Sequence, residues 1–355
     1  MLSDIRVETA CAPAPGALAP PYRTARRMPD DRPGCMGKST LACLHCCFFL
    51  LFFTICEARP ALPYPTKKDL SGQEIAEQVY AVTHGRLVHD ASSQRNGQEI
   101  AMVVSRRPRQ GRSGHPPSVS MFEAYSNADP RDPNIDSMQM TIIRSGQARG
   151  TGILYISYTD KSRAGQLRVW LPSLRKVRRV TGPAQDDTWF GTNLTYGELV
   201  LRRPEHEFHE RLEDGVLVGC LPAMKLEPGE INRHTKSLPE PQCEHKGKPV
   251  YRIRSTTRFT NWWYDYHISE IDRTTFFLYR TVYYKDGKKL KTVVMDWQSL
   301  NQEDPRIGYP RYVYALSHTD GTDTIIFVPR STVRINQGLP DKFWSESTLK
   351  KYGRR

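Results

Sequence analysis

A long succession of short extended segments is the feature that most constrains how this chain folds. Between residues 138 and 336, runs of β-branched and aromatic residues alternate with turns made of Gly, Ser, Pro or Asp. Asp-Gly pairs at 214–215, 286–287 and 320–321 are typical of tight β-hairpins. No crossover helix separates the runs, so we expect the strands to pair antiparallel in one sheet.

We expect about ten or eleven strands in this sheet, with one helix before it and one after it. The ten or eleven strands would come from thirteen runs that suit extended structure: 138–144, 152–159, 167–171, 174–180, 207–212, 216–220, 249–256, 261–269, 275–284, 290–298, 312–318, 322–329 and 331–336. No linker divides this part of the chain, which favours a single domain at 59–355. The expected fold class is therefore mainly β (α+β).

The first helix has a clear start signal in the sequence. Ser71 and Glu74 have the S-x-x-E spacing of a capping box, directly before an apolar-periodic run. Ile75, Val79 and Val82 follow at spacings that place them on one face of a helix. This segment should therefore pack an apolar face against the sheet.

The segments around the sheet are less regular. The first helix should end at Gly85, and residues 90–137 are polar and rich in Pro and Gly. We expect a poorly ordered loop there, around one weak strand near 101–104. A short helix at 345–352, started by a serine, should close the chain.

The amino-terminal sequence predicts export. An apolar run at 41–56 follows Lys38 and precedes the small residues Ala58 and Ala61. The run is shorter than the roughly 20 residues that span a bilayer, and its flanks are those of a secretory signal peptide. We predict a signal peptide at 36–58, with a retained anchor as the alternative.

Residues 1–35 are rich in Pro, Ala and Arg and have no hydrophobic periodicity, so they cannot bury a core. We expect translation to begin at Met36, with Met28 as the alternative. Residues 1–35 would then be an upstream, disordered extension, and the mature protein would be exported and soluble.

Cysteine usage separates the two parts of the chain. Six of the eight Cys residues lie within the first 56 residues, which leaves Cys220 and Cys243 in the mature protein. Because an exported protein folds in an oxidising compartment, this pair is a disulfide candidate; the alternative is two free buried thiols. Cys43 and Cys46 have zinc-like spacing but lie in the apolar run without a second pair, so we exclude a metal site there.

The net charge of +13 leaves several kinds of partner open. A basic surface can bind nucleic acid, anionic lipid head groups or an acidic protein, or it can have no dedicated partner. Arg175, Lys176, Arg178 and Arg179 form a cationic ladder in one expected strand. Because the chain carries an export signal, we expect lipid head groups or the acidic surface of a transporter and no nucleic acid.

Residues 167–199 carry the most distinctive pattern of the chain. It begins W-L-P-x-L-x-K-V-R-R-V, crosses a Gly/Pro/Asp-rich loop and ends F-G-T-N-L-T-Y-x-E-L. This pattern resembles the signature of the LolA-like outer-membrane lipoprotein-sorting family, and the resemblance extends over roughly residues 70–352. The matching residues are Trp170, Leu171, Pro172, Lys176, Val177, Arg178, Arg179, Phe190, Gly191, Thr192, Asn193, Thr195, Tyr196, Glu198 and Leu199. The family more often has Asp where this chain has Asn193, so a carboxylate is missing here.

The resemblance implies a carrier protein. Members of the family are periplasmic, with an unclosed β-barrel capped by helices around a hydrophobic cavity, and are frequently partnered with RND-type lipid exporters. This chain would accordingly bind lipid or lipoprotein acyl chains for outer-membrane sorting, without catalysis. The alternative is an exported accessory subunit that docks an RND-type transporter and has no lipid ligand of its own.

Aromatic residues are dense in the later strands and predict an apolar face. Strict alternation would place Trp263 and His267 opposite the side of Trp262, Tyr264 and Tyr266. Ordinary core packing would explain such a face as well as a groove would, and the family resemblance favours the groove. The expected cavity residues are Met140, Ile142, Leu154, Ile156, Trp262, Tyr264 and Tyr266.

No catalytic constellation is recognisable after the signal segment. His206 and His209 are spaced i and i+3, whereas the zinc-protease helix needs i and i+4, and the segment suits a strand. The mature sequence contains no Gly-rich phosphate loop, nucleophile elbow or Cys-x-x-Cys pair. We therefore predict no enzyme activity, no metal and no cofactor.

Overall fold

The structure is a computed structural model that describes residues 62–106 and 117–353, except 183, 222–225, 227, 234, 237, 241 and 242. The predictions for residues 1–35 and for the signal peptide at 36–58 lie outside the described residues. The described residues belong to one compact unit. None of the helices among them has the length and apolar character needed to cross a membrane.

One antiparallel sheet contains the sixteen described strands. The strands are β1 (Asp90–Ser93), β2 (Ala101–Arg106), β3 (Ser118–Asn127), β4 (Ile135–Ile143), β5 (Gly152–Tyr158), β6 (Gln166–Leu171), β7 (Lys176–Thr181), β8 (Glu207–Arg211), β9 (Gly215–Val216), β10 (Pro249–Thr257), β11 (Tyr266–Asp272), β12 (Leu278–Lys285), β13 (Lys288–Ser299), β14 (Gly308–Ser317), β15 (Asp323–Phe327) and β16 (Val333–Ile335). Their order is β7-β6-β5-β4-β3-β2-β15-β14-β13-β12-β11-β10-β8, with β1 beside β3 and β16, and β9 beside β10.

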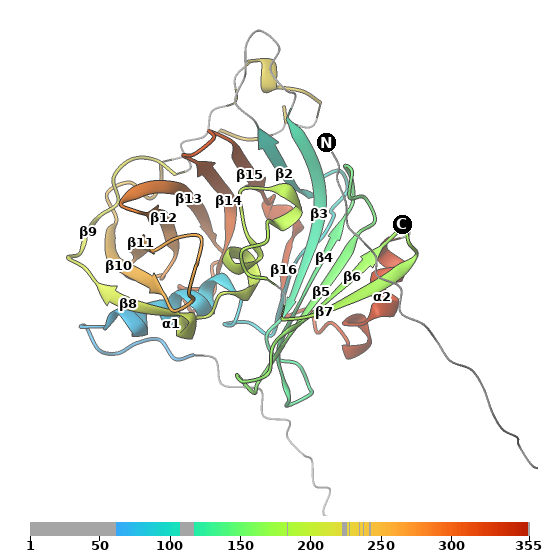
Figure 1. Cartoon of the computed structure of the whole chain (residues 1–355), viewed down its shortest axis with the longest axis horizontal. Coiled ribbons are helices and arrows are strands. Elements are labelled where there is room, and N and C mark those ends of the chain that lie inside the picture. Colours follow the sequence, from blue (N-terminus) through green and yellow to red (C-terminus); the bar gives the residue numbers. More distant parts are fainter. Residues whose placement is uncertain are drawn as a thin grey trace, which may run out of the picture. The chain divides into compact units, whose positions relative to one another are not determined.

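The sheet curls without closing (Figure 1). Among the described strands, β7 and β8 are at opposite ends of the order and do not pair with each other. The predicted fold class, a mainly β chain with an antiparallel, unclosed sheet, is therefore confirmed. The expected number of strands was too low.

The missing strands lie mainly in the stretch that was predicted to be a loop. Residues 90–137 contain β1 and β3, which were not predicted, and β2, which confirms the weak strand expected near 101–104. β1 has the sequence Asp-Ala-Ser-Ser, and it is held by β3 on one side and by β16, near the far end of the chain, on the other. Because both partners are distant in sequence, local composition could not reveal this strand.

Two helices cover different parts of the sheet. α1 (Gly72–Thr83) has the predicted capping box: Ser71 N–H donates to Glu74 Oε2 at 2.8 Å, and Ser71 Oγ accepts from Glu74 N–H. It packs Ile75 and Val82 against β8 and β10. α2 (Glu346–Gly353) packs against β4, β5 and β6. Figure 1 shows α1 beside the curled half formed by β8 and β10–β14.

Both faces of β5 are buried, and the two faces contact different parts of the chain. Leu154 and Ile156 pack with Leu349 of α2. Ile153 and Tyr155, which alternate with them, pack with residues that follow β7. The residues after β7 that contact Ile153 and Tyr155 belong to residues 184–203, which we call the inner segment. The inner segment therefore lies on the sheet face opposite to α2.

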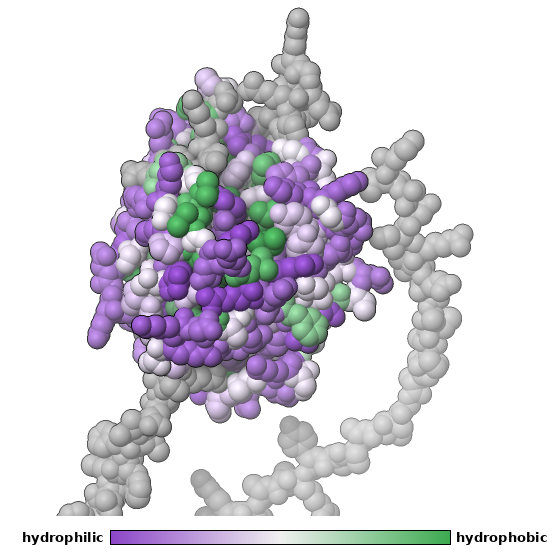
Figure 2. Space-filling view, turned by 90° about the vertical axis from the view of Figure 1, so that its left-hand side faces the viewer, coloured by the Kyte–Doolittle hydropathy of each residue, from purple (hydrophilic) through white to green (hydrophobic). Residues whose placement is uncertain are grey.

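The outer surface is predominantly polar where β8, β9 and β10 lie. Figure 2 shows this side as mainly hydrophilic, with small separate hydrophobic patches. Along β11, Tyr266, Ile268 and Glu270 are partly exposed, whereas His267 and Ser269 between them are buried. The inward side chains of this half therefore determine what the interior can bind.

Candidate functional site

A cavity of about 180 Å³ lies between α1, the end of the inner segment and strands β8 and β10–β14. Ala76 and Val79 of α1 form one wall. Ile253, Ile271 and Leu278 line the opposite wall on the sheet. Most of the lining is therefore apolar, which favours an apolar guest.

One row of inward side chains gives the cavity a polar end. Strand pairing places Ser255 opposite His267, His267 opposite Tyr283, and Tyr283 opposite Lys291. The first three of these line the cavity, and all four residues are buried. The row crosses four neighbouring strands, β10 to β13, at one level.

Along the strands, the side chains that face the cavity become less polar with distance from this row. The next row contains Ile253, Ser269, Thr281 and Val293, which pair in that order across β10 to β13. Beyond it, Ile271 pairs with Leu278, and both line the cavity. The cavity is thus polar at one end, mixed in the middle and apolar at the other end.

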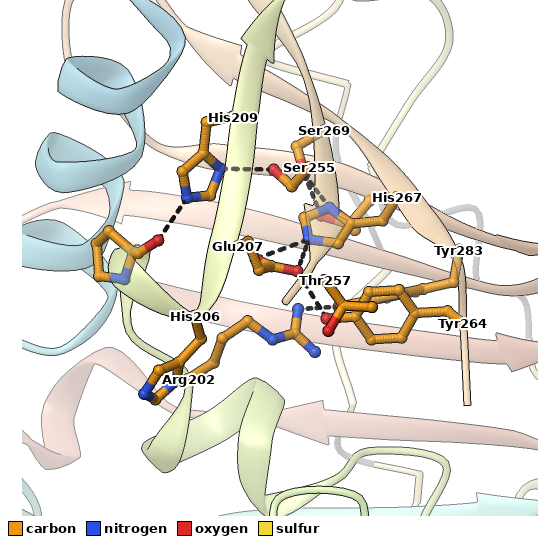
Figure 3. Close-up of polar contacts among 12 residues, drawn as sticks. Arg202, His206, Glu207, His209, Ser255, Thr257, Tyr264, His267, Ser269 and Tyr283 are labelled. Carbon is orange, nitrogen blue, oxygen red and sulfur yellow. Dashed lines mark hydrogen bonds and ion pairs between the residues drawn. The ribbon is translucent and has the colours of Figure 1, made fainter. Parts of the chain in front are cut away.

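Glu207 is the central acid of the polar end. It is 3% exposed at the start of β8, and its Oε1 accepts a hydrogen bond of 2.6 Å from the Tyr264 hydroxyl. His267 Nε2 lies 3.0 Å from the same oxygen (Figure 3). Burial favours the protonated acid, but the charges of His267 and Arg202 and these hydrogen bonds hold the pKa of Glu207 well below its usual value. Glu207 is therefore ionised at neutral pH.

Hydroxyl groups extend this network along the sheet. His267 Nδ1 lies 3.2 Å from Ser269 Oγ, which is 3.0 Å from Thr281 Oγ1. On the neighbouring strands, His209 Nδ1 lies 2.8 Å from Ser255 Oγ (Figure 3). These contacts fix the orientation of the polar side chains around the cavity.

Arg202 approaches the polar end from the inner segment. Its Nη1 donates a hydrogen bond of 2.8 Å to the Tyr283 hydroxyl, and its guanidinium carbon lies 5.3 and 5.4 Å from the ring centres of Tyr264 and Tyr283. Burial would lower the pKa of Arg202, but the two facing tyrosines and Glu207 raise it well above its usual value. Arg202 therefore remains charged.

The inner segment is attached to the sheet by Asn193 and Leu194. Asn193 Nδ2 donates to Thr322 Oγ1 at 2.7 Å, and its Oδ1 accepts from Thr324 Oγ1 at 3.0 Å. Leu194 is fully buried among residues of β2, β13, β14 and β15. This attachment places the following residues beside the cavity.

A buried ion pair secures the same segment. Lys291 Nζ lies 2.6 Å from Glu198 Oε2 and donates a hydrogen bond of 3.0 Å to the Asn193 carbonyl. Burial lowers the pKa of Lys291. Burial alone would raise the pKa of Glu198, but the charges of Lys291 and Arg202 and the hydrogen bonds to the carboxylate together lower it. Glu198 Oε2 also accepts from Thr195 N–H at 2.8 Å.

A second, larger cleft adjoins the cavity. Its volume is about 820 Å³, and it shares Tyr80, Arg203 and Pro204 with the cavity wall. Its lining is charged, with ion pairs such as Arg86 to Asp136 at 2.6 Å. A guest longer than the cavity could extend across this shared wall if the wall moved.

The described part of the chain contains no cluster of side chains suited to bind a metal ion. No group of three or more His, Cys, Asp or Glu lies close enough together there to hold a metal ion. The arrangement can instead hold a small amphiphile, with apolar contacts at one end and hydrogen bonds at the other.

No family model matches the sequence, and no curated protein matches it. Two solved structures are similar to this chain. A domain named for outer-membrane lipoprotein sorting, from Vibrio parahaemolyticus, is 17% identical and aligns with a TM-score of 0.56 over 79% of this chain and 98% of that chain. A DUF1329 family protein from Desulfovibrio piger is 16% identical, with a TM-score of 0.57 over 78% of this chain and 97% of that chain. The chain has a LolA-like fold. The resemblance seen in residues 167–199 is thereby confirmed at the level of the fold.

In this LolA-like fold the family motif occupies two separate places. Its first half forms the β6–β7 hairpin, where Trp170 is buried under α2 and Lys176 and Arg178 are exposed on the edge strand. Its second half, residues 190–199, lies within the inner segment, and Glu198 and Leu199 of this half line the cavity. The motif therefore contributes directly to the cavity wall through two residues.

A sharp turn explains the glycine of the motif. Phe190 and Gly191 both have positive φ, 49° and 71°, and Thr192 Oγ1 donates to the Trp189 carbonyl at 2.7 Å. Two consecutive residues in this region reverse the chain within a few residues. The turn lets Trp189 and Leu194 enter the same core cluster.

The predicted disulfide is confirmed. Cys220 and Cys243 are bonded. Close to the second cysteine, His245 is buried, and its Nε2 lies 2.9 Å from the Trp297 carbonyl. The bonded pair therefore holds this loop next to the strand that lines the cavity.

The predicted cavity residues on β4 and β5 lie elsewhere. Met140, Ile142, Leu154 and Ile156 are buried, but they pack with Trp170 and Leu349 on the face that α2 covers. None of them lines the cavity. The alternation of these strands was correct, but both faces are apolar, so it could not indicate which face borders the cavity.

The aromatic residues predicted to line the cavity also lie outside its wall. Trp262 and Tyr264 belong to the turn before β11, and Tyr266 lies on the outer face, where its ring stacks on Tyr284 at 4.9 Å. Only Tyr264 touches the site, through its hydrogen bond to Glu207. The expected strand at 261–269 began too early, which changed the assignment of faces.

Sequence reasoning missed the polar residues of the site. In β8, Phe208 is 57% exposed while its neighbour Glu207 is buried, so the usual alternation is inverted. His267 joins Glu207 from a position 60 residues later in the sequence, so the pair could not be seen locally. The one available signal was the density of His and Glu at 206–210, which was considered only as a zinc-protease motif and excluded by its spacing.

Proposed function

We propose that this protein is an exported, periplasmic carrier without enzymatic activity, which binds acyl chains of lipids or lipoproteins for outer-membrane sorting. The fold that it shares with a domain named for lipoprotein sorting supports this proposal. The Cys220–Cys243 disulfide supports an oxidising compartment such as the periplasm.

The observation that carries the proposal is the cavity between α1 and the sheet, which is apolar at one end and polar at the other. Each methylene group transferred from water into an apolar site gains about 0.8 kcal/mol. The walls formed by Val79, Ile271 and Leu278 offer such a site, and no chemical step is needed for binding.

The size of the cavity limits the length of the acyl chain that can bind without a conformational change. A cavity of roughly 150 Å³ holds benzene, and the cavity here measures about 180 Å³. A long acyl chain therefore requires α1 or the inner segment to move. Displacement of the wall at Tyr80 and Pro204 would join the cavity to the adjoining cleft of about 820 Å³.

Titration with a fluorescent fatty acid tests the proposal. In the mature chain, Val79→Trp should fill the cavity and weaken acyl binding at least about tenfold, a change of about 1.4 kcal/mol. Val79 lines the cavity. The matched control is Val216→Trp, because Val216 is 55% exposed on β9, and this variant should bind like the wild type.

Extraction of the purified protein with organic solvent, followed by mass spectrometry, gives a second readout. Co-purified acyl lipid in the wild type, reduced in Val79→Trp, is the expected result. Absence of lipid together with absence of fatty-acid binding would overturn the carrier proposal.

A second candidate function is an accessory subunit that docks an RND-type transporter without a lipid ligand. It is favoured by the edge strand β7, whose Lys176, Arg178 and Arg179 are exposed. Such a strand offers both cations and unpaired backbone groups to an acidic partner. If the mature protein binds no lipid but does bind membranes that contain the transporter, this alternative is supported.

A further inference from the structure

Arg202 and Arg203 line the cavity, and Lys291 lies in its polar row. Among these three described cations, Arg203 and Lys291 have a carboxylate partner and Arg202 has none. Lys291 forms an ion pair with Glu198 at 2.6 Å. Arg202 has no carboxylate within ion-pair distance among the residues that the structure describes. A partly buried guanidinium without a direct counter-ion is costly unless a ligand supplies the charge.

Most N–H groups of the Arg202 side chain make no hydrogen bond to a described residue. A guanidinium carries five N–H groups in a planar fork. Within the described part of the chain, the side chain of Arg202 makes one hydrogen bond, from Nη1 to the Tyr283 hydroxyl. The adjacent acid, Glu207, is engaged by Tyr264 and His267 instead.

The position of Arg202 matches the head group of an amphiphile. It contacts Tyr283, a member of the polar row, while Ile271 and Leu278 lie at the apolar end of the same cavity. A guest whose chain lies against Ile271 would therefore direct its head group towards Arg202. Figure 3 shows Arg202 beside Glu207, Tyr264 and Tyr283.

We propose that Arg202 binds the anionic head group of the acyl ligand, so that this protein prefers a carboxylate- or phosphate-bearing amphiphile to a neutral one. The inference rests on the proposed carrier function. An Arg fork pairs with two oxygens of a carboxylate or phosphate, and the low polarity of the site strengthens the pair. A hydroxyl head group offers neither the charge nor the second oxygen.

The test compares three ligands with the same chain length by calorimetry. Dodecanoate carries a carboxylate, dodecyl phosphate carries a phosphate, and dodecanol is neutral. The wild-type mature protein should bind one or both anions at least about tenfold more tightly than dodecanol, since hydrogen bonds between charged groups are the strong ones. The two anions distinguish a fatty-acid head group from a phosphorylated one.

Variants assign this preference to the residue. Arg202→Gln should remove the preference, so that dodecanoate and dodecyl phosphate bind no more tightly than dodecanol. The control Arg254→Gln removes an exposed cation from the outer face of β10 and should leave all three affinities unchanged.

Equal affinity of the wild type for anions and dodecanol would overturn the proposal, and this measurement does not depend on a variant that folds. In that case the carrier function would stand. Failure of all three ligands to bind would overturn both. A preference that persists in a folded Arg202→Gln protein would also overturn the assignment to Arg202.

Discussion

Glu207 carries a buried charge at the polar end of the cavity. Tyr264 and His267 bind the ionised carboxylate, which lowers its pKa from the usual 4.5. A lowered pKa in the folded state means that ionisation stabilises folding. This contribution is complete above the pKa of the unfolded chain, and it is lost as the pH falls from there towards the lower folded-state pKa.

Glu207→Gln should destabilise the protein by about 1–3 kcal/mol at about pH 7, because it removes a charged acceptor from two buried partners. The difference from wild type should shrink at about pH 3, where the unfolded wild type is already protonated. Chemical denaturation at both pH values measures this. Glu210→Gln, on the exposed side of the same strand, should change stability by less than about 0.5 kcal/mol. An equal deficit at both pH values would contradict an ionised Glu207.

Asn193 attaches the inner segment to the sheet through its side-chain amide. Its amide donates to the hydroxyl and the carbonyl of Thr322 and accepts from Thr324. A carboxylate could not donate to the carbonyl, so this attachment depends on a neutral amide. The positive charge of Lys291 is balanced by Glu198.

At the scale of elements, α1 depends on close contact with β8. A Cβ atom at Gly72 would lie 2.5 Å from the His209 carbonyl oxygen and 3.0 Å from Arg211 N. Both contacts involve backbone atoms, which cannot move aside as a flexible side chain can. The absence of a side chain at this position therefore allows the start of the helix to rest on the strand.

Gly72→Ala should destabilise the protein by about 1–3 kcal/mol through overpacking. It should also weaken acyl binding, because α1 forms a wall of the cavity. Gly215→Ala is the control: its Cβ would meet Arg252 at an ordinary 3.7 Å. Thermal melting and fatty-acid titration of both variants measure the effects. Wild-type stability of Gly72→Ala would contradict the packing of α1 on β8.

The disulfide joins two cysteines that are 23 residues apart in sequence. In the chain-entropy description, closing a loop of this length contributes about 3 kcal/mol. Reductant should therefore lower the melting temperature of the wild type. A double variant, Cys220→Ala with Cys243→Ala, should melt lower and show no response to reductant. If reduction of the disulfide left the melting temperature of the wild type unchanged, the result would contradict this contribution.

Sequence predicted elements best where local chemistry determines them. The capping box at Ser71 and the Asp-Gly pair at 286–287 located α1 and the β12–β13 hairpin. Sequence failed for β1, which is held by β3 and by the distant strand β16. It also failed for β3, a strand with many polar residues that pairs with its neighbours β2 and β4. It also failed at 261–265, where aromatic residues that suit a strand form a turn packed around Tyr264. Tertiary contacts outweighed β-propensity there.

At the scale of the molecule, the sheet has buried side chains on both of its faces. α2 covers one face of β4–β6, whereas α1 and the inner segment share the other face with the cavity. Hydrophobic alternation predicts that two faces exist, but it does not say which one encloses a cavity. The site could not be predicted for the same reason, since it forms only when β8, β10–β13 and the inner segment meet.

The central claim is that an acyl chain occupies the cavity beneath α1. Photocrosslinking with a fatty acid that carries a diazirine near the end of its chain, followed by peptide mapping, tests it most directly. The account predicts labelling of α1 near Val79 and of strands β11–β13 near Ile271 and Leu278, suppressed by unlabelled fatty acid and by Val79→Trp. Labelling confined to the α2 face around Leu154, or to the outer surface, would contradict it.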